Sequence, residues 1–353
     1  MKILYIANVR IPTDQAHGWA VMKMCEALVS AGAEVELIVP RRLNSIKEEA
    51  FEFYSMKRTF RLTKVPSLDL TRWGKIGFFI QWVSFACLAV LYSIRHKADC
   101  YYGRDELSLW LISFLKKDRV VWEAHTAKSN WLVRALLRKI HSVVAISNGI
   151  RERLLDLAKN VPILVLPSGF DQELFNSVTD TKEVLRNKFN LPLHKIIVAY
   201  VGKLQTFGES KGVEKLEEAV RIIKEKHDDV ELLVVSEASP IDVPAYMKAS
   251  DILVMNYPNR EHYAKFMSPL KLFEYMASGN PIATSDLPTV REIVDESMVS
   301  FFEPDNPKSL ARAVNYLIEN PEEAKAKSAR ARDAVKQYSW QERAKRVLKF
   351  ISI

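Results

Sequence analysis

The sequence predicts an α/β protein with two doubly wound domains, each built on a mostly parallel sheet. Its 353 residues exceed the size to which one hydrophobic core usually grows. Hydrophobic residues make up 48% and charged residues 27%, a composition typical of folded soluble chains. Apolar runs of strand length alternate with helical patterns, as in βαβ units, and this alternation occurs twice. We therefore expect two Rossmann-like domains that face a central cleft.

The first series of strands begins at the N-terminus, where a helix over 18–31 separates the first two runs. Its six candidates are KILYIA, EVELIVP, DCYYG, RVVWEAH, SVVAIS and PILVLPS. The second series comprises KIIVAYVG, VELLVVS, DILVMN, PIATSD and MVSFFEP. A loop with Pro and Gly separates the two series, which predicts domains over 1–167 and 168–338. Residues 339–353 are expected to form a helix that packs back on the first domain.

The charge of +8 is distributed unevenly between the two halves. Residues 1–167 carry 25 Lys and Arg against 15 Asp and Glu, whereas residues 168–353 carry 26 against 28. This asymmetry indicates that the first half meets an anionic membrane surface, an acidic acceptor or nucleic acid. Nucleic acid is disfavoured, because the basic residues are interleaved with apolar helical faces.

The cysteines and one long apolar run indicate where in the cell the protein is expected. The three cysteines are odd in number and lack C-x-x-C spacing, which disfavours disulfides and a zinc site and indicates a reducing cytoplasm. Residues 76–94 are long enough to span a bilayer. Because this run leads directly into a strand, we expect instead a buried core helix or a helix partly exposed for docking on the inner face of the membrane.

The segment MSPLKLFEYMASGNPIATSDLP, residues 267–288, is the most informative part of the chain. Ser268 and Pro269 are expected to start a helix that Gly279 closes before the next strand. The helix N-terminus then lies at the carboxyl edge of the sheet, where free amides and the helix dipole bind phosphate. Glu274, one to two turns along, is placed to accept hydrogen bonds from ribose hydroxyls.

This segment resembles the second half of the E-x7-E signature of glycosyltransferase family 4, whose members are retaining GT-B enzymes. VGKLQTFGESKG (201–212), VLPSGFDQELF (165–175) and SVVAISNGIRERL (142–154) also match it. The resemblance implies that Lys203 and Lys211 neutralise the leaving diphosphate. It further implies a nucleotide-binding set formed by Gly18, Gly202, Ser268, Pro269, Leu270, Lys271 and Glu274.

The chain departs from the family pattern at two positions. Phe266 stands where the first glutamate of E-x7-E should contact the transferred sugar, and Lys203 replaces the commoner arginine. In the first domain, His125 matches a family histidine that points at the donor sugar. Arg104 and Asp105 follow another strand towards the same edge, and Gly18, beside His17 in the first strand-to-helix loop, would permit close backbone approach.

Several other chemistries are disfavoured by the sequence. It contains no G-x-x-x-x-G-K-[ST], G-x-S-x-G, H-E-x-x-H or D-x-D, so we expect no metal and no permanently bound cofactor. We predict transfer of a hexose-type sugar from a UDP- or GDP-sugar to a glycan or lipid-linked acceptor in cell-surface polysaccharide synthesis. Two alternatives stay open, namely a catalytically silent scaffold subunit, suggested by Phe266, and a nucleotide-sugar epimerase.

Overall fold

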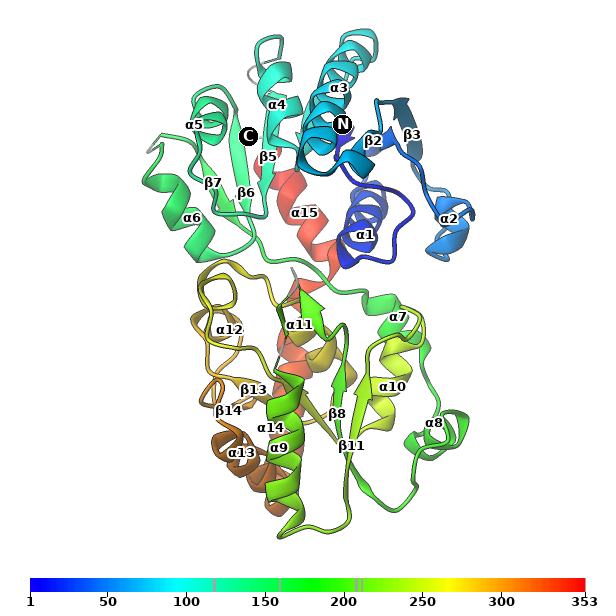
Figure 1. The fold of residues 1–353 in the computed structure, drawn as a ribbon, viewed down its shortest axis with the longest axis vertical. Helices are drawn as coiled ribbons and strands as arrows, with labels where there is room; N and C mark the ends of the chain where they lie inside the picture. The colour runs from blue at the N-terminus through cyan, green and yellow to red at the C-terminus, as the bar shows by residue number, and fades with distance from the viewer. Residues whose placement is uncertain (117–118, 159, 207–208, 211, 353) are drawn as a thin grey trace. The chain divides into compact units, whose positions relative to one another are not determined.

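The computed structural model describes residues 1–116, 119–158, 160–206, 209–210 and 212–352. Its contacts divide the chain into two compact units (Figure 1). Unit 1 comprises Met1–Ser168 and Trp340–Ile353, and unit 2 comprises Gly169–Ser339. Each unit is an α/β domain with one parallel main sheet, which confirms the predicted fold class.

Unit 1 is built on a seven-stranded sheet in the order β3-β2-β1-β4-β5-β6-β7, and all neighbouring strands are parallel. The central strands carry continuous apolar runs because helices cover both faces of the sheet. Strand β3 was not predicted, since its charged residues and partial exposure make it a polar edge strand. The strands are β1 (Lys2–Ile6), β2 (Glu34–Arg41), β3 (Arg61–Pro66), β4 (Cys100–Gly103), β5 (Val120–Ala124), β6 (Ser142–Ala145) and β7 (Ile163–Val165).

The last helix of the chain belongs to unit 1, where α15 lies against α1 (Figure 1). Several helix starts are capped by a side chain that accepts from a backbone N–H, among them Asp105, Asn130 and Ser147. The helices of unit 1 are α1 (Ala16–Ser30), α2 (Ala50–Phe53), η1 (Thr71–Trp73), α3 (Gly74–Arg95), α4 (Glu106–Ser113), α5 (Trp131–Leu137), α6 (Asn148–Leu155) and α15 (Trp340–Ile351).

Helix α3 contains the long apolar run, and by length and composition it could cross a membrane. It packs against α4 and β3, but only a third of its most apolar window is buried. The alternative of a buried core helix is therefore wrong, because most of the helix surface lies outside the packed core.

Unit 2 is built on a five-stranded parallel sheet in the order β11-β8-β12-β13-β14, together with a short antiparallel pair, β9 and β10. Its strands are β8 (Ile196–Val201), β9 (Gln205–Thr206), β10 (Glu209–Ser210), β11 (Val230–Val235), β12 (Ile252–Met255), β13 (Ile282–Ser285) and β14 (Ser300–Phe302). Its helices are α7 (Gln172–Ser177), α8 (Lys182–Lys188), α9 (Val213–Lys224), α10 (Val243–Ala249), η3 (His262–Phe266), α11 (Leu270–Ser278), α12 (Pro288–Arg291), α13 (Pro307–Glu319), α14 (Pro321–Ala334) and η4 (Val335–Tyr338).

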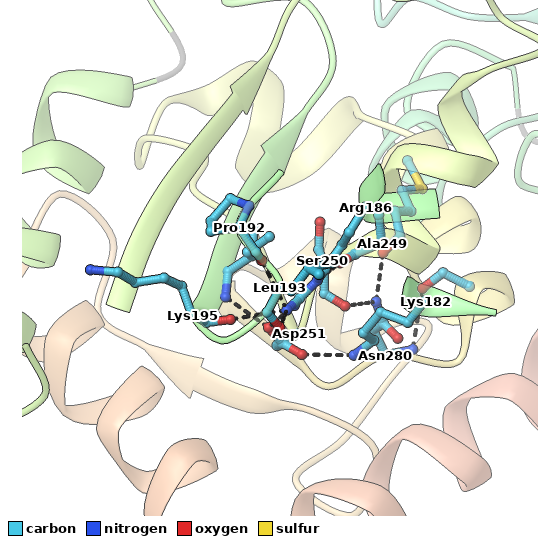
Figure 2. A network of polar contacts seen from close by, with 12 residues as sticks. Lys182, Arg186, Pro192, Leu193, Lys195, Ala249, Ser250, Asp251 and Asn280 are labelled. Atoms are coloured by element: carbon cyan, nitrogen blue, oxygen red, sulfur yellow. Dashed lines mark hydrogen bonds and ion pairs between the residues drawn. The ribbon is translucent and has the colours of Figure 1, made fainter. Parts of the chain in front are cut away.

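A polar network around Arg186 joins α8 to the amino end of this sheet (Figure 2). The buried guanidinium donates to four backbone carbonyls, those of Pro192, Leu193, Lys195 and Ala249, and also pairs with Asp251. A guanidinium has five donors and no acceptor, so one arginine can satisfy several loop carbonyls. This network fixes the amino end of the sheet.

Candidate functional site

The carboxyl end of β8 meets the start of α11 in unit 2. Gly202 follows β8 directly with φ +136°, and a Cβ atom added to it would lie 2.2 Å from Lys271 Nζ and 2.7 Å from Lys271 Cε. A Cβ at position 202 would therefore displace the end of the Lys271 side chain. This contact brings together two stretches that the sequence suggested separately, VGK at 201–203 and the helix after Pro269.

Positive charge is held at this edge by an aromatic ring. The buried Lys271 places Nζ 3.8 Å from the centroid of the Tyr200 ring. The Tyr200 hydroxyl donates to the Lys203 carbonyl at 2.9 Å and so fixes the turn after β8. The Lys203 side chain is exposed. One buried and one exposed lysine thus lie on the two elements that meet here.

The start of α11 differs from the expectation. The helix begins at Leu270, Pro269 is its N-cap, and no side chain caps it. Pro269 has no N–H, and the Leu270 N–H donates to the Ser268 carbonyl at 2.9 Å. Pro269 therefore offers no amide to a phosphate, and the Leu270 amide already has a carbonyl partner, so the positive charge shown here is that of Lys271 and of the helix dipole.

Glu274 lies one turn along α11 and is half-buried. Burial raises its pKa to about 7, although the nearby Lys271 lowers it. Within the described part of the chain, no donor forms a hydrogen bond to its carboxylate. Gly279 ends the helix as predicted, as its C-cap, with φ 80°. The structure therefore presents a carboxyl group poised between its neutral and ionised forms near neutral pH.

Phe266 and Lys211 are the other two positions of unit 2 that the sequence singled out. Phe266 ends the π-helical turn η3 and is partly buried, so no carboxylate stands at the first glutamate position. Lys211 lies outside the residues that the structure describes.

In unit 1, the buried carboxylate of Glu123 is the centre of a charged network at the end of β5. Its Oε1 atom lies 2.8 Å from His125 Nε2, 3.1 Å from Arg104 Nη2 and 3.0 Å from Arg343 Nη2, while Oε2 accepts from Tyr5 Oη at 2.8 Å. Arg343 comes from α15, which explains why the end of the chain belongs to this unit. Despite the desolvation that opposes it, the two guanidinium groups lower the pKa of Glu123 well below its usual value.

This network determines the protonation state of His125. Desolvation, followed by the charge of Arg104, lowers its pKa to about 4, so the ring is neutral at pH 7. Because the carboxylate is an acceptor, the ring hydrogen lies on Nε2, and Nδ1 is then an acceptor. The side chain is 27% exposed, so it remains accessible to a ligand hydroxyl.

Gly18 and Asp105, two further candidate site residues of unit 1, contact other residues of the same unit. Gly18 lies inside α1 rather than in the preceding loop, and a Cβ there would lie 2.3 Å from Thr13 Cγ2 and 2.5 Å from Tyr54 Oη. Asp105 is buried, caps α4 through Ser108 N–H at 2.9 Å, and accepts from Trp82 Nε1 at 2.7 Å. Packing and helix capping account for these two residues.

Sequence reasoning missed Glu123 and Arg343. Glu123 had a recognisable signal, because a carboxylate inside an otherwise apolar strand, two residues from a candidate histidine, lies on the same side of the strand. Arg343 had none, since 220 residues separate it from Glu123. Among the described residues, no group of three His, Cys, Asp or Glu could hold a metal ion.

Two glycosyltransferase family models match the chain, one in each unit. A model described as "Glycosyltransferase Family 4" matches residues 18–174, and one described as "Glycosyl transferases group 1" matches residues 195–320. A glycosyltransferase model thus matches most of each unit. The two parallel-sheet domains are those of the GT-B fold.

Solved structures share the fold of the chain over almost its whole length. Sucrose-phosphate synthase from Thermosynechococcus elongatus has a TM-score of 0.75 at 18% identity, with 99% of this chain and 98% of that chain covered. Anabaena HepE in complex with UDP-glucose has a TM-score of 0.72 at 16% identity, covering 99% and 100%. At such identities the likeness shows the fold alone.

Two curated relatives of the chain come from Bacillus subtilis (strain 168), and both are named as glycosyltransferases of teichuronic acid biosynthesis. TuaH is 28% identical over 116 residues, which cover 33% of this chain and 29% of TuaH. TuaC is 24% identical over 186 residues, which cover 49% of this chain and 45% of TuaC. The chain therefore matches less than half the length of either relative.

Proposed function

We propose that the chain transfers a hexose-type sugar from a UDP- or GDP-sugar to a glycan or lipid-linked acceptor in cell-surface polysaccharide synthesis, with retention of configuration and without a metal. One observation carries the proposal. The Gly202 loop lies against Lys271 on α11, so Lys203, Lys271 and Glu274 come from two elements that meet at the carboxyl end of β8. This is the edge at which doubly wound sheets bind nucleotides.

The chemistry of sugar transfer requires what this edge offers. As the bond to the anomeric carbon breaks, negative charge builds up on the diphosphate, and fixed cations near it lower the barrier. Lys203 and Lys271 provide those charges beside the positive end of the α11 dipole. Lys211 is assigned to the same role by the sequence resemblance.

Glu274 is proposed to accept hydrogen bonds from the ribose hydroxyls. Such bonds stabilise the ionised carboxylate, so nucleotide binding lowers the pKa of Glu274 from about 7. The complex should then release protons near neutral pH, which calorimetry in buffers of different ionisation enthalpy would detect.

Unit 1 is proposed to bind the acceptor. Its His125 would contribute a neutral imidazole whose Nδ1 accepts a hydrogen bond from a sugar hydroxyl. The names of the two Bacillus relatives support a polysaccharide product, and the UDP-glucose complex of HepE supports a uridine donor. A lipid-linked acceptor would place the enzyme on the inner face of the cell membrane.

Thermal shift against UDP, GDP and their sugar conjugates tests this proposal. One nucleotide class should raise the melting temperature of the parent protein, since a ligand that binds only the folded state stabilises it. Glu274→Ala should abolish the shift, whereas Glu217→Ala, at an exposed position of α9, should keep it. A Glu274→Ala protein that responds like the parent would remove the assigned site.

Phe266 favours a second candidate, a nucleotide-binding scaffold without turnover. The apolar ring stands in η3 where the family pattern expects a carboxylate for the transferred sugar. Nucleotide release from any donor, with an acceptor present, would exclude the scaffold. Nucleotide binding without release from every donor would support it.

A further inference from the structure

Helix α3 is inverted with respect to an ordinary surface helix. The side chains that it buries are mostly small or polar, and they include Gly77, Gln81, Ala86, Ala89 and Ser93. Phe85 is the large apolar side chain among the buried residues of the helix. Five other large apolar side chains, and Trp73 just before the helix, are exposed by 49–73%: Trp73, Ile76, Phe78, Phe79, Leu91 and Ile94. A soluble surface helix normally turns its apolar stripe towards the core, so this outward face is built for an apolar partner.

The distribution of charge along α3 identifies the partner. The helix has 22 residues, about 33 Å at the usual rise per residue, and contains no Asp or Glu. Exposed cations stand at its two ends, Arg72 and Lys75 at one and Arg95 and Lys97 at the other. An apolar stripe with basic residues at its borders complements a lipid surface with anionic headgroups.

The helices beside α3 extend this character. α4 packs between α3 and α5 (Figure 1). Trp131, at the start of α5, is 67% exposed, and Phe114, at the end of α4, is 56% exposed. The ring of Trp110 contacts both of these rings, at centroid distances of 5.7 Å and 5.2 Å. Aromatic side chains, tryptophan above all, favour the headgroup level of a bilayer.

The inner face of α3 is held by contacts that a membrane-spanning helix could not keep. Gln81 Nε2 donates to Asn8 Oδ1 at 3.0 Å, and Tyr92 Oη donates to Glu36 Oε1 at 2.6 Å. A Cβ on Gly77 would lie 1.7 Å from the Leu70 carbonyl oxygen, which shows how closely the helix is packed. The helix therefore stays part of unit 1 while its outer face is free to enter a lipid interface.

We infer that unit 1 docks on an anionic lipid leaflet with α3 lying flat in the interface. The inference rests on the proposed function, because it names the surface that would bring the enzyme to a lipid-linked acceptor. The exposed apolar side chains enter the acyl boundary, and the cations at the helix ends contact the headgroups.

Vesicle flotation of the full chain tests the inference. The parent should float with vesicles of phosphatidylcholine and phosphatidylglycerol, and more weakly with phosphatidylcholine alone. The double variant Ile76→Glu/Phe79→Glu should lose about tenfold or more of its partition, since two large apolar groups become charged. Arg72→Glu/Lys75→Glu should lose binding to the anionic vesicles only. Val184→Glu, at a 52% exposed apolar position in unit 2, is the control and should float like the parent.

Three results would overturn the inference: a parent that stays in solution with both vesicle types, an Ile76→Glu/Phe79→Glu variant that floats like the parent, or a membrane-bound pool that resists alkaline carbonate, which would indicate a spanning helix. Light scattering without lipid tests whether a second copy of the chain binds this face instead. A parent that forms dimers, and an Ile76→Glu/Phe79→Glu variant that does not, would assign the face to dimerisation and also overturn the inference. The nucleotide thermal shift of this variant should equal that of the parent. Flotation without any nucleotide shift would therefore contradict the proposed function alone.

Discussion

The two strand-end sites differ in how their charged groups are held. In unit 1, the buried Glu123 has hydrogen-bond or ionic partners on His125, Arg104, Arg343 and Tyr5. In unit 2, the Glu274 carboxylate has no hydrogen-bond donor among the described residues, and its pKa is raised to about 7. One carboxylate is fully ionised and fixed, whereas the other lies near its titration point.

This difference suggests that the two sites do different work. A carboxylate surrounded by donors holds its neighbours in one geometry before a ligand arrives, as preorganised electrostatic sites require. A carboxylate without donors is costly to ionise in the free protein and gains its partners from a ligand. We therefore expect changes in the unit 1 network to affect stability most, and changes in the unit 2 site to affect nucleotide binding most.

Arg343→Met should have the largest effect on stability. It removes a 2% exposed guanidinium from a fully buried carboxylate, and breaking a buried ion pair costs about 3 to 5 kcal/mol. Urea denaturation measures the loss. The pKa of His125, which the charge of Arg343 helps to lower, should also rise above about 4 when followed by NMR.

Arg346→Met is the matched control, because Arg346 is exposed on the same helix. It should change the free energy of unfolding by no more than about 0.5 kcal/mol. Equal stabilities for the two variants would mean that Glu123 does not depend on α15, and the contrast between the sites would lose its basis.

The sequence predicted most of the fold because the strand runs of parallel sheets are nearly continuous and apolar. Every predicted run contains a strand of the structure, from β1 to β14. The strands that the sequence did not predict are the polar edge strand β3 and the two-residue strands β9 and β10, which lack such a run. The apolar period of α3 did not reveal which face packs inward, because its inner face depends on Gly77 and on Gln81 meeting Asn8.

The candidate site was predictable only where it follows the chain locally. Lys203 and Glu274 came from motifs within single loops and helices. The contact of Gly202 with Lys271 joins residues 69 positions apart, and that of Glu123 with Arg343 joins residues 220 positions apart. Such partners are set by the path of the chain through the two sheets, which local periodicity does not encode.

Gly202→Ala should have the next largest effect, on the unit 2 site. The substitution strains a φ of +136° and drives a Cβ into Lys271, at an expected cost of about 1 to 3 kcal/mol. Gly32→Ala is the control for strain alone, because Gly32 has φ +96° and nothing within 4 Å of an added Cβ. The difference in urea denaturation between the variants gives the cost of displacing Lys271. Nucleotide affinity should fall only in Gly202→Ala, and an unchanged affinity would separate Lys271 from the nucleotide site.

The pH dependence of Glu274 should be smaller. The folded pKa of about 7 exceeds the unfolded value near 4.3, so the folded state binds this proton more tightly. Its contribution is fully present below about pH 4 and is lost as the pH rises through about 7. Glu274→Gln removes the titration, so the variant should gain up to about 2.5 kcal/mol relative to the parent between pH 5 and pH 8. Urea denaturation at the two pH values measures this gain, with Glu217→Gln as the exposed control. A constant difference between Glu274→Gln and the parent would show that the carboxylate is already stabilised without a ligand.

Lys203→Met should have the smallest effect on stability and therefore sharpens the contrast most cleanly. The exposed side chain follows the Gly202 turn, and that turn is held through the Lys203 carbonyl, which the substitution keeps. The free energy of unfolding should change by no more than about 0.5 kcal/mol. Nucleotide affinity should nevertheless fall several-fold at low salt, and less at high salt, because an exposed charge acts on the diphosphate through a screened field. Titration calorimetry at two ionic strengths measures both quantities, with Lys195→Met at the opposite end of β8 as the control. If the two variants bound nucleotide equally well, the charge at this turn would serve solubility rather than the ligand, and neutralising the diphosphate would be left to the buried Lys271 and to Lys211.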